Sequence, residues 1–512
     1  MPRRRLTAIL AILGVGAVLR LWTIGDGLPY LVGSDEPVIF ERVAAMMKTG
    51  DLNPRIYDYP GFVFYFHLAL ASVQFLLGAV RGAWTSLDQV TANDFYLWGR
   101  VGTALLGTLT IYVVYRAATR WSEAVALVAA VATAVQPQLV REAHYALTDT
   151  PLTFFVALTM LLSLRAAEQE TLKAFAIAGL AAGLATGTKY NGVVAGLMPL
   201  AALVSTLPMA RWPGGLAAIA AGSAAGFFAV APYSLLDLPG FLNGFAVLAQ
   251  SYNREMSAFA NADVYRKYVQ DWFGMPGTLP RAATWPAFLV MLAGFGSVAV
   301  GFRRRGTRPN AAILLVFPVV YFWILANQSL PFGRYAMPLV PAIAIGLAVG
   351  IMGIHGLAAR RAPGAAPLAL AALLLLVPPA LTAVSFNRDR ARDDTLELTA
   401  RWIDRSVKPT EPIVLEGRYR MFWLPARTFT AIQVQQLIDA PLDEYRFKNA
   451  VYLVAVLWER DGYFQNPEKF PDQVRAYTEI FRQTELVQHF TPSREHPGPE
   501  IRILRLTKPG AP

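Results

Sequence analysis

The chain has 512 residues, of which 55% are hydrophobic and 16% are charged, and it contains no cysteine. Disulfide and thiolate chemistry are therefore excluded, and the composition is that of a membrane protein. The net charge of +11 lies mainly in short loops beside apolar segments, where membrane topology explains it, so we expect no nucleic-acid partner.

Apolar segments of about the length that crosses a bilayer, roughly 17–25 residues, recur along the first three quarters of the chain. The first follows a run of three arginines and could also be a signal peptide, but no A-x-A-like cleavage site follows it, so we expect an uncleaved span. We predict eleven spans, at 6–24, 98–116, 121–138, 150–165, 173–188, 190–206, 213–232, 284–302, 310–327, 335–354 and 365–384.

One more apolar stretch, 60–80, decides the topology, because counting it as a span reverses the side of everything after it. If it lies in the interface, short arginine-rich loops such as 303–309 face the cytoplasm, as the positive-inside rule requires. The N-terminus is then cytoplasmic and the C-terminal region periplasmic or extracellular. Fourteen of the seventeen acidic residues before residue 385 fall on the outer face, which favours chemistry at that face over transport through the spans.

Two adjacent carboxylates, Asp35 and Glu36, follow the first span in the stretch VGSDEPVIF. The next residues have helical apolar spacing with Pro37 at an early position, so Asp35 is a candidate helix cap, where acids are favoured by the helix dipole. The alternative is that this pair supplies a catalytic carboxylate. Asp58, before the 60–80 stretch, and Arg100, at the start of the second span, are consistent with a site lined by the first outer loop.

The stretch REAHYALTDTP places His144 and Asp149 on the next short outer loop. Asp149 could simply cap the following span, and His144 could be an interfacial side chain. With Glu36 they are also the candidate ligands of a divalent ion such as Mg²⁺, Mn²⁺ or Zn²⁺, although one histidine among scattered acids is not by itself a metal motif.

The stretch GLAAGLATGTKYNG carries Gly179, Gly183 and Gly187 at every fourth position, which predicts a helix face for close packing. It is not a P-loop, because Lys189 is followed by Tyr190 and not by Ser or Thr. A cation at the outer turn between two apolar helices needs water or an anion, and a phosphate is one candidate.

A second outer cation is Arg334, in the stretch NQSLPFGRYAMPLVPA at the start of a later span. Its side chain could reach the lipid head groups by snorkelling. The alternative is that its planar guanidinium holds a lipid-borne phosphate.

After the last span the composition changes to charged residues of both signs and short apolar runs. We therefore predict a transmembrane domain at 1–384 and a soluble domain at 385–512. Residues 385–394 are predicted to be a polar linker, and 395–407 and 472–482 to be helices. The apolar stretches EPIVLE, AVYLVAVLW and EIRILRLT are predicted strands. Alternating helices and buried strands indicate a small α/β domain.

The motifs, in this order, resemble the polyprenyl-phosphate-dependent glycosyltransferases of the GT-C class, in the branch of the protein O-mannosyltransferases and lipid A aminoarabinose transferases. Beyond the acidic pair, the resemblance rests on DYPGFVFYFHLAL, FYLWGRVGTALLGTLTIYVVYRAATRW, REAHYALTDTPLTFF, GLATGTKYNGV and RYAMPLVPAIA. It covers most of the chain. The implied fold is a GT-C-like polytopic α-helical membrane domain with interfacial helices, followed by an exported α/β domain.

The resemblance also implies roles for individual residues. Asp35 becomes the catalytic carboxylate with Glu36 beside it, and Lys189 and Arg334 become contacts of the donor phosphate. The remaining residues expected at the substrate are Asp58, Tyr59, Arg100, His144, Asp149 and Tyr190. Asp58 and Tyr59 stand where the aminoarabinose transferases carry a Glu-Lys pair, and the absence of that lysine argues against an aminoarabinose–lipid A activity.

The implied reaction moves a sugar from a polyprenyl-phosphate donor to a lipid, glycan or protein acceptor at the outer face of the cytoplasmic (plasma) membrane. One carboxylate can serve as base in an inverting transfer, because the phosphate leaves without needing a proton, whereas hydrolases flank the bond with two carboxylates. The alternatives are a lipid or sugar transporter and a membrane scaffold without catalysis. A transporter would be expected to carry functional charges inside its spans.

Overall fold

The computed structural model describes residues 3–30, 35–255, 285–327, 332–360, 364, 366–417, 430–457, 463–464 and 466–506. Contacts within the chain divide it into two compact units. The first consists of residues 1–24 and 39–386, and the second of residues 25–38 and 387–512. The second unit therefore joins the C-terminal region to the segment 25–38, between α1 and the body of α2.

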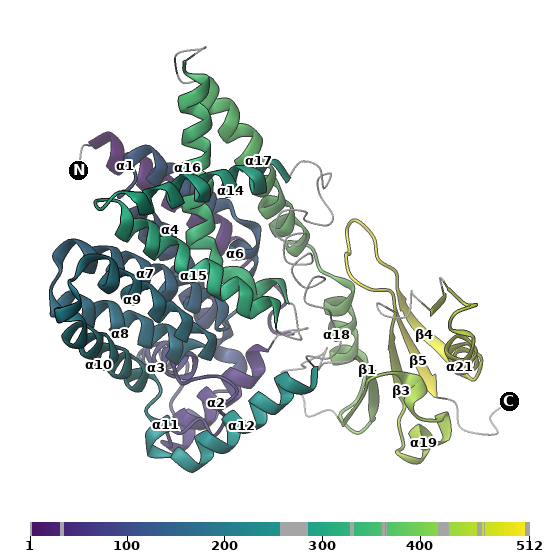
Figure 1. The fold of residues 1–512 in the computed structure, drawn as a ribbon. Helices are drawn as coiled ribbons and strands as arrows, with labels where there is room; N and C mark the ends of the chain where they lie inside the picture. The colour runs from purple at the N-terminus through teal and green to yellow at the C-terminus, as the bar shows by residue number, and fades with distance from the viewer. Residues whose placement is uncertain are drawn as a thin grey trace. The chain divides into compact units, whose positions relative to one another are not determined.

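The first unit is built of helices (Figure 1). Its elements, two of which continue into the second unit, are α1 (Arg3–Leu21), α2 (Glu36–Thr49), α3 (Phe62–Val80), α4 (Tyr96–Ala118), α5 (Glu123–Val135), α6 (Pro137–Glu142), α7 (Asp149–Gln169), α8 (Leu172–Thr188), η3 (Tyr190–Gly196), α9 (Leu197–Thr206), α10 (Trp212–Val230), α11 (Tyr233–Leu236), α12 (Leu238–Glu255), α14 (Trp285–Val300), α15 (Arg308–Ala326), η7 (Gly333–Leu339), α16 (Val340–Ala358) and α17 (Ala366–Arg390).

Eight helical stretches among the described residues are long and apolar enough to cross a membrane. One of them is α3, which we expected to lie in the interface, and the others coincide with predicted spans. Helices α5 and α8 and the η3–α9 stretch are apolar but shorter than the rest. Helix α1 carries arginines at both ends. Each predicted span thus corresponds to a helix, while the number that crosses the membrane stays a prediction.

Helices α8 and α10 pack with their backbones in close contact (Figure 1). A Cβ atom on Gly179 or Gly183 of α8 would clash with the carbonyl oxygen of Ile219 or Ser223 on α10. Gly222 of α10 lies equally close to the carbonyl oxygen of Ala176 on α8. The predicted small-residue face is therefore confirmed, and α8 ends at Thr188, directly before Lys189.

Helix α7 is the centre of the first unit. It packs against α4, α8, α9 and η7, and most of its surface is buried. Because α7 begins at Asp149, its first turn meets the end of α8 and the 3₁₀ helix η7. Three segments that are far apart in the sequence therefore converge at one end of the bundle.

The second unit is a five-stranded sheet with helices on both faces. The strands are β1 (Ile413–Glu416), β2 (Ala431–Val434), β3 (Tyr452–Val456), β4 (Thr484–Phe490) and β5 (Ile501–Leu506), in the order β2-β1-β3-β5-β4. β1 is parallel to β2 and β3, and β5 is antiparallel to β3 and β4.

Residues of each buried strand alternate between the two faces of the sheet. One face packs on α18 (Thr395–Ser406), and the other on α19 (Leu442–Phe447) and α21 (Pro471–Arg482). The predicted α/β domain is confirmed. One detail was wrong: the expected linker 385–394 is helical as far as Arg390, where α17 ends.

Candidate active site

An ionic cluster joins three of the predicted site residues. Lys189 Nζ lies 2.7 Å from Asp149 Oδ1, and Arg334 Nε lies 3.8 Å from Asp149 Oδ2. The Asp149 side chain is 5% exposed and that of Lys189 is 15% exposed. The anion that the sequence required for Lys189 is, in this structure, the carboxylate at the first residue of α7.

Aromatic and amide groups fix the surroundings of Lys189. Its ammonium lies 4.3 Å from the centroid of the Tyr335 ring, within the range of a cation–π contact. The carbonyl oxygen of Tyr335 accepts a hydrogen bond from the Tyr321 hydroxyl at 3.1 Å. That hydroxyl in turn accepts from Asn191 Nδ2 at 2.8 Å, so η3, α15 and η7 are tied together next to the cation.

Glu142 is a buried carboxyl near this cluster whose importance was not evident from the sequence. Gln138 Nε2 donates to Glu142 Oε1 at 2.8 Å. Burial is the main cause that raises the pKa of Glu142, and the charge of Asp149 raises it further, against the lowering effects of Arg141, Arg334 and Lys189. Glu142 Oε1 also lies 3.5 Å from Arg141 Nε, so Lys189 and Arg334 against Asp149 leave the cluster with about one positive charge in excess.

His144 does not have the surroundings of a metal ligand. It is fully buried, with Nδ1 2.8 Å from the carbonyl oxygen of Val140 and Nε2 2.7 Å from that of Trp22. Both ring nitrogens therefore face backbone acceptors, and Asp149 is engaged with two cations. Within the described part of the chain, no three His, Asp or Glu residues are grouped as a metal site would require, so the candidate ligands do not fit a metal here.

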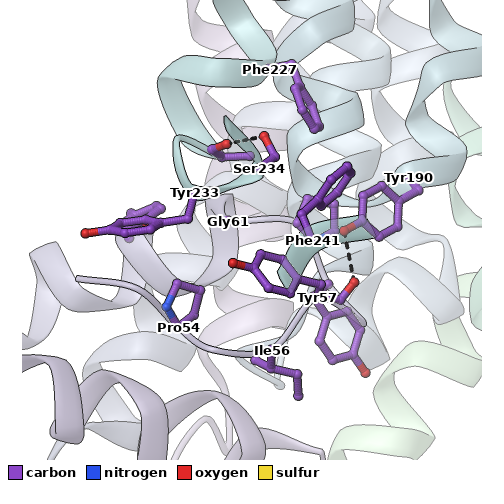
Figure 2. A pocket seen from close by; sticks show the side chains of 13 residues that line it. Pro54, Ile56, Tyr57, Gly61, Tyr190, Phe227, Tyr233, Ser234 and Phe241 are labelled. Atoms are coloured by element: carbon purple, nitrogen blue, oxygen red, sulfur yellow. Dashed lines mark hydrogen bonds between the residues drawn. The ribbon is translucent and has the colours of Figure 1, made fainter. Parts of the chain in front are cut away.

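A small hollow lies beside Tyr190. Its walls are largely aromatic, with Tyr57, Tyr190, Tyr233 and Phe241 among them, and Tyr59 also lines it (Figure 2). The Tyr190 hydroxyl donates to the carbonyl oxygen of Tyr57 at 2.9 Å, so it is used for structure and the ring faces the hollow. Lys189 immediately precedes Tyr190 in extended backbone, which directs the two side chains to opposite sides of the chain.

Hydrogen bonds to Asp237 hold one wall of this hollow in place. Asp237, directly before α12, accepts hydrogen bonds through Oδ2 from Asn53 Nδ2 at 2.9 Å and from the Tyr57 hydroxyl at 2.8 Å. Its Oδ1 accepts from the backbone of Gly240 at 3.2 Å. These hydrogen bonds lower the pKa of Asp237, while burial followed by the bond to Asp237 raises that of Tyr57 to about 12. The hydrogen bonds of Asp237 with Asn53 and Tyr57 could not be predicted, because no periodicity relates these residues.

The remaining predicted site residues lie in different surroundings. Arg100 is buried and its Nη1 donates to the carbonyl oxygen of Ile24 at 3.3 Å, while Asp58 is exposed. Glu36 is the first residue of α2 and is fully buried, and Asp35 directly precedes it. Both carboxylates belong to the segment 25–38 of the second unit.

Comparisons with known proteins agree with this architecture. Residues 93–235 match the family described as dolichyl-phosphate-mannose-protein mannosyltransferase, a stretch that contains α7, α8 and Lys189. No match was found among curated proteins.

Two kinds of solved structure are similar to this chain in fold. The oligosaccharyltransferase of Archaeoglobus fulgidus, solved in the apo form, has 14% identity and a TM-score of 0.59, with 90% of this chain and 70% of that chain covered. The same protein solved with zinc and sulfate gives 14% identity, a TM-score of 0.59, and 95% and 72% coverage. ArnT from Cupriavidus metallidurans, bound to undecaprenyl phosphate, has 16% identity and a TM-score of 0.55, with 98% of each chain covered. In its fold, with many apolar helices and a C-terminal sheet domain, this chain is therefore similar to these two kinds of structure, and its residues 93–235 match the mannosyltransferase family.

Proposed function

We propose that the protein is a glycosyltransferase that uses a polyprenyl-phosphate-linked sugar as donor at the outer face of the cytoplasmic membrane. The observation that carries this proposal is the Asp149–Lys189–Arg334 cluster, with its excess of positive charge, at one end of a bundle of apolar helices. A site of this kind suits a ligand with one anionic group and an apolar tail.

The proposed donor binds with its phosphate against Lys189 and Arg334, and its prenyl chain contacts the aromatic surface beside Tyr190. The hydroxyls of Tyr57 and Tyr190 are bonded within the protein, so the hollow offers mainly carbon surface to an apolar chain. Lys189 and Tyr190 are adjacent in the chain, so the two proposed subsites lie on either side of the same stretch of backbone. ArnT from Cupriavidus metallidurans was solved with undecaprenyl phosphate, a ligand of this chemical class.

In the proposed reaction, a hydroxyl of the lipid, glycan or protein acceptor attacks the anomeric carbon of the donor sugar as the bond from that carbon to the phosphate oxygen breaks. The acceptor proton passes to the Asp35 carboxylate, which acts as general base. The phosphate leaves with one additional negative charge, which Lys189 and Arg334 stabilise. Attack opposite the leaving group inverts the anomeric centre.

The test measures transfer and phosphate release by purified protein in lipid vesicles, with a synthetic polyprenyl-phosphate sugar and lysate-derived acceptors. Asp35→Asn should abolish release of polyprenyl phosphate while the variant still binds the donor. Lys189→Met should weaken donor binding itself. A wild-type rate in Asp35→Asn would refute the assignment of the base, and equal donor affinity in Lys189→Met would refute the phosphate site. Sugar flux across the vesicles without phosphate release would indicate a transporter.

A further inference from the structure

The segment 25–38, which carries Asp35 and Glu36, is attached to the C-terminal α/β domain. Two side-chain pairs among the described residues contribute to the attachment. Asp26 Oδ2 lies 3.0 Å from Arg390 Nη2, with side chains 22% and 15% exposed. The Tyr30 hydroxyl donates to Asp404 Oδ2 at 3.1 Å.

The partner of Tyr30 is held rigidly by the domain. Asp404 lies on α18, which buries Leu396, Ala400 and Ile403 against the sheet. The Tyr30 ring packs on the same hydrophobic core. Burial, followed by the hydrogen bond to Asp404, raises the pKa of Tyr30, so the phenol keeps the proton that it donates.

These contacts add little to the domain itself. The buried residues of that core all come from 396–503, and Tyr30 is only partly buried at its margin. Removing the Tyr30 hydroxyl therefore leaves the core of the domain intact. The contacts restrict the position of Asp35 instead. Asp35 follows Tyr30 by five residues, so the two can be at most about 18 Å apart along an extended chain.

We propose that the C-terminal domain is a positioning element for Asp35, because it holds the segment that carries this residue through Tyr30–Asp404 and Asp26–Arg390. This inference rests on the proposed function, in which Asp35 is the base. Tyr30, Asp26, Arg390 and Asp404 do not touch the substrate in this scheme. They limit the positions that the Asp35 carboxylate can adopt, and a displacement of about 1 Å of a catalytic group can cost on the order of a hundredfold in rate.

The test compares the full-length variants Tyr30→Phe, Asp26→Asn and their combination with the wild type in the vesicle assay. Each single variant should lower kcat, and the combination should lower it by about tenfold or more, while affinity for polyprenyl phosphate stays unchanged. Hydrogen exchange of the peptide that covers 25–38 should become faster, and exchange of β1 and β3 should not. A merely structural contact would change β1 and β3 as well.

The matched control is Asp443→Asn, which removes an exposed ion pair of the same domain, with Arg446 Nη1 2.7 Å from Asp443 Oδ1. It should leave kcat and exchange of 25–38 unchanged. If Asp35→Asn is inactive but Tyr30→Phe, Asp26→Asn and the combination keep the wild-type kcat, the positioning role is wrong and the proposed function stands. If Asp35→Asn is fully active, the proposed base is wrong, whatever the loop variants do.

Discussion

Neutralising Asp149 should destabilise the protein more than neutralising Lys189. The Asp149 carboxylate is the shared partner of two cations, with Lys189 Nζ at 2.7 Å and Arg334 Nε at 3.8 Å. Asp149→Asn leaves both cations close together in a largely buried site without their counter-ion. Lys189→Met removes one cation and leaves Asp149 beside Arg334.

The magnitudes follow from this asymmetry. Removing one partner of a buried ion pair costs about 3–5 kcal/mol, the range we expect for Asp149→Asn. Lys189→Met should cost about 1.5–3 kcal/mol, as for one charged hydrogen bond, because Arg334 still compensates Asp149. The double variant should cost less than the sum of the two, since both changes remove the same interaction.

Thermal unfolding of the detergent-solubilised protein, followed by tryptophan fluorescence, ranks the variants. Glu168→Gln is the control, because Arg120 Nε and Glu168 Oε1 form a pair at 2.9 Å in which Glu168 is 52% exposed, and such a surface pair contributes about 0–1 kcal/mol. An equal loss in Glu168→Gln and Asp149→Asn, or a larger loss in Lys189→Met than in Asp149→Asn, would refute the shared counter-ion.

Three further changes test other parts of the structure. Gly183→Ala should destabilise the protein by about 1–3 kcal/mol, because the added Cβ would overpack against the Ser223 carbonyl of α10. Gly356→Ala is the control and should be tolerated, because a Cβ there meets no atom within 4 Å. The unfolding temperatures of the two variants test this difference. Burial raises the pKa of Glu142 above the ordinary 4.5. The stability that Glu142 contributes is therefore fully present below pH 4.5 and is lost as the pH rises through the raised pKa. Glu142→Gln should remove this loss and flatten the stability–pH profile over that range. Asp237→Ala should release the wall of the aromatic hollow and raise KM for the donor with little change in kcat, which initial rates at varied donor concentration would measure.

The close packing of α8 on α10 could be predicted because it depends on a local pattern, glycines at every fourth position of one helix. The requirement of Lys189 for an anion followed equally from the cost of a cation between apolar helices. Which anion it meets could not be predicted, because Asp149 precedes Lys189 by 40 residues and meets it only through the packing of α7 on α8. The contact with Arg334 depends further on where η7 lies against α7.

Other features depend on residues that no periodicity relates. His144 suggested a metal by its residue type, and only the fold shows that its nitrogens face the carbonyl oxygens of Val140 and Trp22. Tyr30 and Asp404 are 374 residues apart, so the attachment of the segment 25–38 to the C-terminal domain has no local signal in the sequence.

The charge balance of the ionic cluster has a consequence for the kind of donor. Two cations, Lys189 and Arg334, face one carboxylate, Asp149, and Glu142 has Arg141 beside it at 3.5 Å, so about one positive charge remains in excess. A sugar on a lipid monophosphate carries one negative charge and balances this excess before the reaction, and the second charge that develops on the leaving phosphate is then drawn by two cations in surroundings of low dielectric. A lipid diphosphate would bring at least two negative charges before any bond breaks, and Asp149 would repel the second. Asp149 therefore acts as the counter-ion that keeps two partly buried cations stable without donor, and through the same charge it should favour a monophosphate over a diphosphate.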